Sequence, residues 1–364
     1  MSFLPLPDPV FICMESRPCL PLEQLRPMLA QDLRDFPDDE QQTIWNNPRW
    51  IAEEKLNGVR LLGFIGHSEN RFTTRVISKR SGLFQERTDN FPHLRDLSLG
   101  FLDGTILDGE LLLNKPRLFT GSAEAVGTLA CTMAVTNCGP ERAAETQRRE
   151  GMADFHVFDV LRDRGRWVGD EPLYKRRARL EAIFRELDGQ GIGQRHLKLL
   201  SQERESKHAY YQSILANGGE GVVLKHAAGL YKMNGRSALV LKAKRFLTVD
   251  GFISGFTPGE HGNSGKVGSL LVSAYDSDGN VREIAGVGPY DLSRGANSNL
   301  REAVTVQAPS GPQLSPQFLG RVVELEAFCW NRNLRLVHAK ILRFRDGDKA
   351  RTDCIIDFGS MRVG

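Results

Sequence analysis

The chain has 364 residues, of which 40% are hydrophobic and 26% are charged, and its formal net charge is +3. This length exceeds one ordinary compact domain and suits two, and the composition is that of globular proteins. No stretch is long and apolar enough to cross a bilayer, which excludes a membrane-spanning protein. So small a net charge is compatible with nucleic-acid binding but does not indicate it. A DNA-binding face must therefore come from local clusters of basic residues.

The cysteines and the first residues bear on the cellular compartment. Six cysteines stand singly, without the spacing of a metal site or of a disulfide framework. The first residues are interrupted by prolines and lack a basic segment, so they make a poor signal peptide. We expect a cytoplasmic protein, either bacterial or encoded by a phage and made within its host cell.

The first two thirds of the chain mix strand and helix signals. Residues 1–48 are rich in Pro, Asp and Gln around one short apolar helix candidate at 22–33. From residue 50 the pattern predicts strand, turn and strand, with Asn57-Gly58 as the turn. An apolar stripe predicts a helix at 172–187. Further strands are predicted at 75–78, 105–113, 154–161, 221–226 and 238–244.

After about residue 247 the character changes. Helix signals become rare, and short apolar runs alternate with turns, as expected of a small β-barrel. We therefore place a domain boundary near residue 247. The runs lie at 251–256, 269–275, 281–287, 321–330 and 336–343.

A lysine lies at the tip of the first predicted hairpin. In the segment 53–60, Lys55 is held between two strands by backbone geometry, and Gly58 would let a ligand approach closely. Such a lysine can act as a nucleophile if neighbouring cations or a metal lower its pKa. Taken alone, this segment is more often an ordinary charged turn.

Other segments supply the partners that such a lysine needs. Glu110 lies within an apolar strand, and Glu220 precedes another, where carboxylates are costly unless paired or bound to metal. Lys242 and Lys244 lie one residue apart and so on one side of a strand. A nucleophilic lysine, two strand carboxylates and two more lysines suit transfer of a phosphoryl group to lysine.

With these segments in this order, the chain resembles the covalent nucleotidyltransferases, which comprise ATP-dependent DNA ligases, RNA ligases and mRNA capping enzymes. The sequence KLNG at 55–58 is similar to the family's KxDG, which implies that Lys55 accepts the nucleotide. Glu53 matches the residue that reads the adenine amino group in DNA ligases, and Arg60 matches the arginine that follows KxDG.

The resemblance extends through the other motifs of the catalytic domain. The sequence SKRSG at 78–82 is similar to SRxG, which implies that Arg80 contacts the ribose or a phosphate. Phe158, in the sequence FHVFDV, matches the aromatic residue that stacks on the base. The remaining matches are Glu110 in DGE, Glu220 in EGVVLK, and the pair Lys242 and Lys244.

The last third resembles the OB domain that follows in ligases. The sequence GKVGSL at 265–270 is similar to its GKxGSL turn, and 343–349 is similar to the final arginine-rich motif. The resemblance implies that this motif, with Arg343, Arg345 and Lys349, contacts the nucleotide phosphates. Its RDGDK spacing differs from RxDK, and Asn57 replaces the usual Asp of KxDG. Because Asn keeps an acceptor, we expect reduced but surviving function there.

The implied fold class is α+β. A nucleotidyltransferase domain at 1–247, built on antiparallel sheets with flanking helices, would be followed by an all-β OB-fold barrel at 248–364. The implied activity is ATP-dependent ligation of breaks in duplex DNA, through lysyl-AMP and an adenylated 5′-phosphate. ATP donates AMP, Mg²⁺ is held by Glu110 and Glu220, and the partner is nicked duplex DNA bound by a monomer without membrane attachment.

Two rivals remain. Within the superfamily, the chain would be an RNA ligase or a GTP-dependent capping enzyme, although Glu53 and the GKxGSL turn favour an ATP-dependent DNA ligase. The second rival is not an enzyme: the chain would be a catalytically inactive module that binds nicks or ends of nucleic acid. The complete set of Lys55, the strand carboxylates and the lysine pair argues against the inactive module.

Overall fold

The computed structural model describes residues 25–75, 84–113, 129, 131–193, 195–260, 262, 264–289, 300–331 and 333–359. The chain divides into two compact units, of which the first comprises 1–115, 129–208 and 223–242, and the second 116–128, 209–222 and 243–364. The boundary expected near residue 247 stays a prediction about domains, because the segment 209–222 groups with the second unit. Arg80 and its motif lie outside the described residues.

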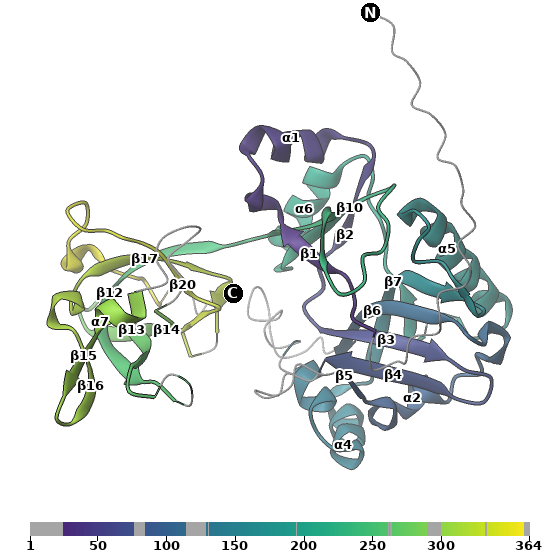
Figure 1. Cartoon of the computed structure of the whole chain (residues 1–364), viewed down its shortest axis with the longest axis horizontal. Helices are drawn as coiled ribbons and strands as arrows, with labels where there is room; N and C mark the ends of the chain where they lie inside the picture. The colour runs from purple at the N-terminus through teal and green to yellow at the C-terminus, as the bar shows by residue number, and fades with distance from the viewer. Residues whose placement is uncertain are drawn as a thin grey trace, which may run out of the picture. The chain divides into compact units, whose positions relative to one another are not determined.

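The first unit is built on a large sheet in which β9 pairs with β7 in parallel and all other pairs are antiparallel (Figure 1). The strands run in the order β5-β4-β3-β6-β7-β8. Their bounds are β3 (Val59–Ile65), β4 (Asn70–Arg75), β5 (Phe84–Glu86), β6 (Ile106–Leu113), β7 (Ala153–Asp163), β8 (Arg166–Trp167) and β9 (Leu197–Leu199).

A smaller sheet has the order β1-β11-β10-β2. Its strands are β1 (Leu29–Asp32), β2 (Trp50–Glu54), β10 (Gly221–His226) and β11 (Arg236–Lys244). The expected helix at 22–33 is wrong for its described part. Pro27 lacks the amide that a helix would use, and β1 instead pairs in parallel with β11.

Helices flank the large sheet. The predicted helix at 172–187 is confirmed as α5 (Leu173–Gly189), and its apolar stripe is buried. Further helices of the chain are α1 (Asp38–Asn46), α2 (Pro92–Arg95), α4 (Pro140–Glu150), α6 (Lys207–Ala216) and α7 (Leu300–Val304), and residues 131–136 are also helical. Among the residues with assigned structure, no helix has both the length and the apolar character needed to span a membrane.

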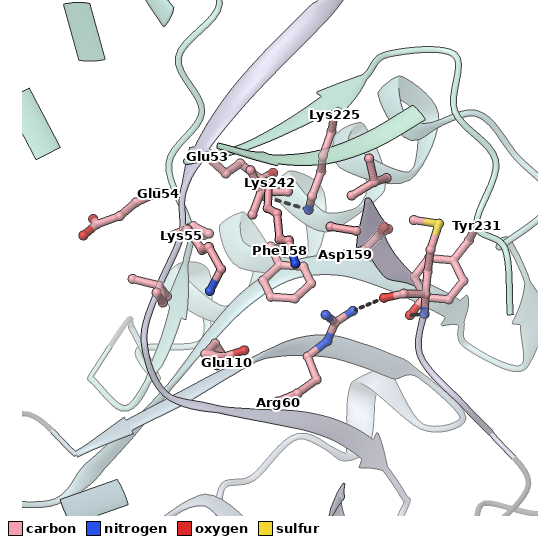
Figure 2. Close-up of a pocket in the computed structure, with 16 residues that line it drawn as sticks. Glu53, Glu54, Lys55, Arg60, Glu110, Phe158, Asp159, Lys225, Tyr231 and Lys242 are labelled. Carbon is pink, nitrogen blue, oxygen red and sulfur yellow. Dashed lines mark hydrogen bonds and ion pairs between the residues drawn. The ribbon is translucent and has the colours of Figure 1, made fainter. Parts of the chain in front are cut away.

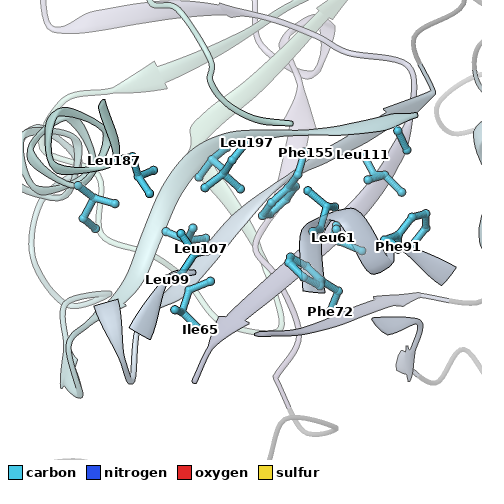
Figure 3. Close-up of a cluster of buried hydrophobic side chains, with 14 of the residues drawn as sticks. Leu61, Ile65, Phe72, Phe91, Leu99, Leu107, Leu111, Phe155, Leu187 and Leu197 are labelled. Atoms are coloured by element: carbon cyan, nitrogen blue, oxygen red, sulfur yellow. The ribbon is translucent and has the colours of Figure 1, made fainter. Parts of the chain in front are cut away.

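The large sheet is buried on both faces. On one face, residues such as Leu61, Phe72 and Phe155 form a core with α2, α4 and α5 (Figure 3). Leu62, the next residue along β3, points to the opposite face and packs with Tyr231 and residues of the smaller sheet. Each such side chain, when fully buried, contributes roughly 1.5–3 kcal/mol. The two layers of packing fix the strands that carry the charged residues described below.

The second unit is rich in antiparallel strands. Five of them form a sheet in the order β14-β13-β12-β17-β20, around a separate apolar core. Within the described residues this path stays open, without a pairing of β14 to β20, so closure into an OB-fold barrel is not confirmed. The strands are β12 (Leu247–Pro258), β13 (Val267–Tyr275), β14 (Val281–Val287), β15 (Thr305–Ala308), β16 (Gly311–Leu314), β17 (Val322–Ala327), β18 (Cys329–Trp330), β19 (Leu336–Val337) and β20 (Lys340–Phe344).

Candidate active site

A cavity of about 150 Å³ in the first unit brings together six of the residues predicted from the sequence. Figure 2 shows Lys55, Lys242 and Arg60 pointing toward the ring of Phe158. Strands of both sheets contribute to the lining. The lining residues are Met28, Ala30, Glu53, Glu54, Lys55, Leu56, Arg60, Glu110, Phe158, Asp159, Leu200, Val223, Lys225, Tyr231, Val240 and Lys242.

Lys55 lies in the short connection between β2 and β3, as the sequence predicts. The two strands belong to different sheets and do not pair with each other, so the connection is not the expected hairpin. A β-carbon added at Gly58 would lie 2.2 Å from the carbonyl oxygen of Leu111, so only glycine allows β6 to pass this close. The Gly58 amide donates a hydrogen bond of 3.2 Å to Glu110 Oε1. Gly58 therefore lets the connection that carries Lys55 lie against β6, and the close approach of a ligand expected there stays a prediction.

The cavity residue Arg60 is held by a buried acid, Asp108. Its Nε and Nη2 lie 2.5 and 2.6 Å from the two oxygens of Asp108, whose side chain is fully buried. The Tyr231 hydroxyl donates to the same carboxylate over 2.5 Å and accepts from the Met28 amide over 3.0 Å. Burial alone lowers the pKa of Arg60, but the charge and hydrogen bonds of Asp108, together with Tyr231 and Glu110, outweigh it and raise that pKa. Arg60 thus presents a permanent positive charge in a fixed position.

Phe158 lies among cations and beside a second buried pair. The Arg60 guanidinium is 4.6 Å and the Lys225 ammonium 4.3 Å from its ring centroid. Lys225 also lies 2.6 Å from Glu53, whose side chain is 2% exposed. The predicted reader of the base amino group is therefore next to the predicted stacking residue.

Two carboxylates of the cavity have different surroundings. Asp159 is committed to Arg176 of α5, with contacts of 2.8 and 2.9 Å, and so serves the fold. Glu54, the neighbour of Lys55, has its pKa raised by burial. The chain thus keeps a carboxyl group with a weakened preference for the charged form beside the predicted nucleophile.

Glu220 and Lys244 belong to the second unit and are not among the residues that line the cavity. The Lys244 ammonium forms an ion pair with Glu220, which is buried at the start of β10. Lys242 instead lines the cavity together with Val240, two residues earlier on β11. The lysine pair is therefore confirmed on one strand, and one of its members reaches the cavity.

The final basic motif lies at the end of β20 in the second unit. Arg343 Nε is 2.6 Å from Glu324, while Arg345 Nη1 and Lys349 Nζ lie 3.1 and 2.5 Å from Asp250. Each predicted cation therefore has an acidic partner within its own unit.

The residues of the cavity could hold Mg²⁺ only together with the phosphates of a bound nucleotide. Within the described ranges, no group of three or more His, Cys, Asp or Glu side chains could hold a metal. Mg²⁺ is commonly bound by one or two carboxylates and by the phosphates of its substrate. Glu110 offers one such carboxylate in the cavity, so a nucleotide-borne Mg²⁺ fits these residues.

Sequence reasoning missed several residues that line the cavity or hold its lining residues in place. Asp108 was part of a recognised segment, yet its bond to Arg60 has no local signal because 48 residues separate the two. Tyr231 gave no signal at all. Lys225 could have been found, because it lies two residues after Val223 on β10 and both line the cavity.

Comparison with known proteins identifies the family. The family model "ATP dependent DNA ligase domain" matches residues 27–244. A DNA ligase of Methanopyrus kandleri is 27% identical over 272 residues, covering 74% of this chain and 45% of that protein. A probable DNA ligase of Streptomyces coelicolor is also 27% identical, covering 83% of this chain and 57% of its own length.

The chain thus spans about half the length of these curated relatives. A solved structure from a study of Lig E DNA ligases has a TM-score of 0.56 and 18% identity, covering 88% of this chain and 99% of its own, which shows a shared fold. Because the family model covers more than half of the chain, the protein belongs to the ATP-dependent DNA ligase domain family.

Proposed function

We propose that the protein is an ATP-dependent DNA ligase that seals breaks in duplex DNA. One observation carries the proposal: a single cavity gathers the predicted nucleophile Lys55 with the predicted stacking ring, the predicted base reader, the predicted carboxylate Glu110 and the predicted cations Arg60 and Lys242. Adenine would stack on Phe158 with its amino group at Glu53, and its phosphates would extend toward Arg60 and Lys242. This arrangement suits transfer of the α-phosphoryl group of ATP to Lys55.

The proposed reaction has three steps. The neutral Lys55 amine attacks the α-phosphorus, an N–P bond forms, and the bond to pyrophosphate breaks. A 5′-phosphate of DNA then attacks the phosphorus of lysyl-AMP, and the N–P bond breaks. AMP is now attached to the DNA end, and Lys55 is free again. Finally a 3′-hydroxyl attacks this activated phosphate, and AMP departs. Positioning and charge neutralisation would supply most of the rate enhancement.

The chain's own residues divide this work. Arg60 and Lys242 would neutralise charge on the phosphates, and Glu110 would hold both the Gly58 amide and a nucleotide-borne Mg²⁺. That ion would stabilise negative charge that develops on the transferred phosphoryl group. Arg80 remains the proposed ribose or phosphate contact. Glu220 remains the second proposed Mg²⁺ ligand, and Lys244 a further phosphate contact.

The second unit would bind the DNA substrate. We propose that its antiparallel strands form the OB-fold domain of a monomeric ligase, with Arg343, Arg345 and Lys349 first orienting the pyrophosphate. The unit would then hold the duplex backbone without reading sequence. Sealing should therefore decrease steeply as salt rises; a flat response between low and moderate ionic strength would contradict this role.

The test is a denaturing-gel time course on a nicked DNA duplex with a labelled 5′-phosphate, ATP and Mg²⁺. Wild-type protein should produce sealed strand, and Lys55→Ala should produce neither sealed nor adenylated strand. Sealing of RNA ends alone, or activity with GTP in place of ATP, would instead identify one of the related nucleotidyltransferases. Absence of any adenylated protein would leave only a binding module.

A further inference from the structure

Lys225 is a buried lysine whose position the proposed reaction does not explain. Its side chain is 7% exposed and lines the cavity from β10. The ammonium lies 2.6 Å from Glu53 Oε2, as a close ion pair, and has no aligned hydrogen-bond acceptor among the residues that the structure describes. Burying an ammonium is unfavourable unless it is compensated, so this placement requires a reason.

Glu53 is the group that Lys225 fixes. Its other oxygen, Oε1, accepts a hydrogen bond of 2.8 Å from Gln202 Nε2. The carboxylate is therefore held at both oxygens, by residues that come from different parts of the chain. An ionised carboxylate has about four lone-pair sites, so two partners leave capacity for one more donor from the cavity.

The same lysine contacts the stacking residue. Its ammonium lies 4.3 Å from the centroid of the Phe158 ring, and Figure 2 shows Lys225 joined to Glu53 on the Phe158 side of the cavity. Lys225 thus contacts both the ring on which a base would stack and the carboxylate that would accept a hydrogen bond from the edge of that base.

We propose that Lys225, assisted by Gln202, is a positioning residue that sets selectivity for a 6-aminopurine. It holds Glu53 as an oriented carboxylate, which accepts from an exocyclic amino group and repels a carbonyl oxygen at the same place. The inference rests on the proposed function, because it assigns this end of the cavity to the base of ATP. Without Lys225, Glu53 would be a buried charge without its cation and would lose its orientation.

The experiment compares nucleotides that differ only at position 6 of the base. Transfer of the nucleoside monophosphate to Lys55 is measured with ATP and with purine riboside triphosphate. The second nucleotide carries hydrogen in place of the amino group. Wild type should prefer ATP by about tenfold to hundredfold in kcat/KM, the usual effect of one hydrogen bond to a charged group. Lys225→Met should bring this ratio near one, chiefly through KM for ATP, and Lys225→Arg should restore the preference.

Two further variants separate positioning from general damage. Lys207→Met removes another buried lysine, which donates to the Arg204 carbonyl and does not line the cavity, and it should keep the wild-type ratio. Gln202→Leu removes the second partner of Glu53 and should lower the ratio, so it decides the matter if Lys225→Met does not fold.

A Lys225→Met protein that keeps the full preference for ATP, or that loses activity with both nucleotides in proportion, would overturn the inference while leaving the ligase assignment intact. Wild-type protein that labels Lys55 with neither nucleotide would overturn the proposed function itself, and this inference with it.

Discussion

The cavity of the first unit and the final basic motif of the second unit hold their charged residues in opposite ways. In the first unit, the cavity residue Glu53 and the Arg60 partner Asp108 are almost completely buried, and each is held by residues from other strands or loops. In the second unit, Arg343 is 56% exposed, and its partner Glu324 lies on the neighbouring strand. The first arrangement fixes geometry, whereas the second leaves charges accessible to solvent.

This difference has a physical consequence. Removing one member of a buried pair leaves an uncompensated charge, which costs about 3–5 kcal/mol, whereas an exposed pair contributes about 0–1 kcal/mol. A catalytic cavity benefits from fixed charges because they need no reorganisation during reaction. A surface that must exchange its acidic partners for phosphates benefits from weak pairs. The predictions below test this contrast.

The largest effect is expected at Asp108. Asp108→Asn removes the charge that balances Arg60 and should lower the free energy of unfolding by about 3–5 kcal/mol, measured by denaturant titration. Adenylation of Lys55 should decrease as well, because Arg60 loses its fixed position. Unfolding unchanged within error would show that the buried pair does not stabilise the first unit.

A smaller effect is expected at Tyr231. Tyr231→Phe keeps the ring but removes the hydroxyl that donates to Asp108, which should cost about 1–3 kcal/mol. Burial, followed by the Asp108 charge, raises the pKa of this phenol, so the hydroxyl stays protonated and the loss should be constant across neutral and mildly alkaline pH. A loss that disappears at neutral pH would contradict the assignment of donor and acceptor.

Glu54 should produce a still smaller effect, which depends on pH. Because burial raises its pKa in the folded state, its contribution to stability is greatest in acid and is lost as pH rises through that pKa. Glu54→Gln should therefore raise Tm slightly at neutral pH, and the difference from wild type should vanish below the ordinary glutamate pKa. A difference that grows in acid would reverse this sign.

The smallest effect is expected at an exposed pair of the second unit. Asp346 pairs with Arg321 and is 54% exposed. Asp346→Asn should change the free energy of unfolding by less than about 1 kcal/mol. Denaturant titration of both Asp346→Asn and Asp108→Asn measures the two losses in free energy of unfolding. Equal losses would contradict the contrast between exposed and buried pairs.

Much of the fold was predictable because strand and helix periodicities are local. The two strands that flank Lys55, the helix at 172–187 and the strand-rich second unit all follow from short-range patterns. The hairpin expected around Lys55 is wrong, because its two strands join different sheets. The helix expected at 22–33 failed because a parallel pairing of β1 with β11 overrides local propensity, and this pairing joins residues about two hundred positions apart.

Six residues of the candidate cavity were predictable from the sequence, but the partners that hold them were not. Lys55, Glu53, Arg60, Glu110, Phe158 and Lys242 carry recognisable motif positions, and the cavity brings them together. The bonds from Arg60 and Tyr231 to Asp108, and from Lys225 and Gln202 to Glu53, join residues distant in sequence. Motifs in the sequence identify individual residues, but the partners of Asp108 and Glu53 are determined by how the two sheets pack.

The most direct test of the central claim is the chemical identity of the adenylated residue. The protein would be incubated with ATP and Mg²⁺ without DNA, and intact mass and peptide mapping would locate the adduct. We predict one AMP on the peptide that contains Lys55, none in Lys55→Ala, and an undiminished adduct in the Lys207→Met control. AMP on a different lysine, or an adduct that survives Lys55→Ala, would contradict the assignment of this cavity.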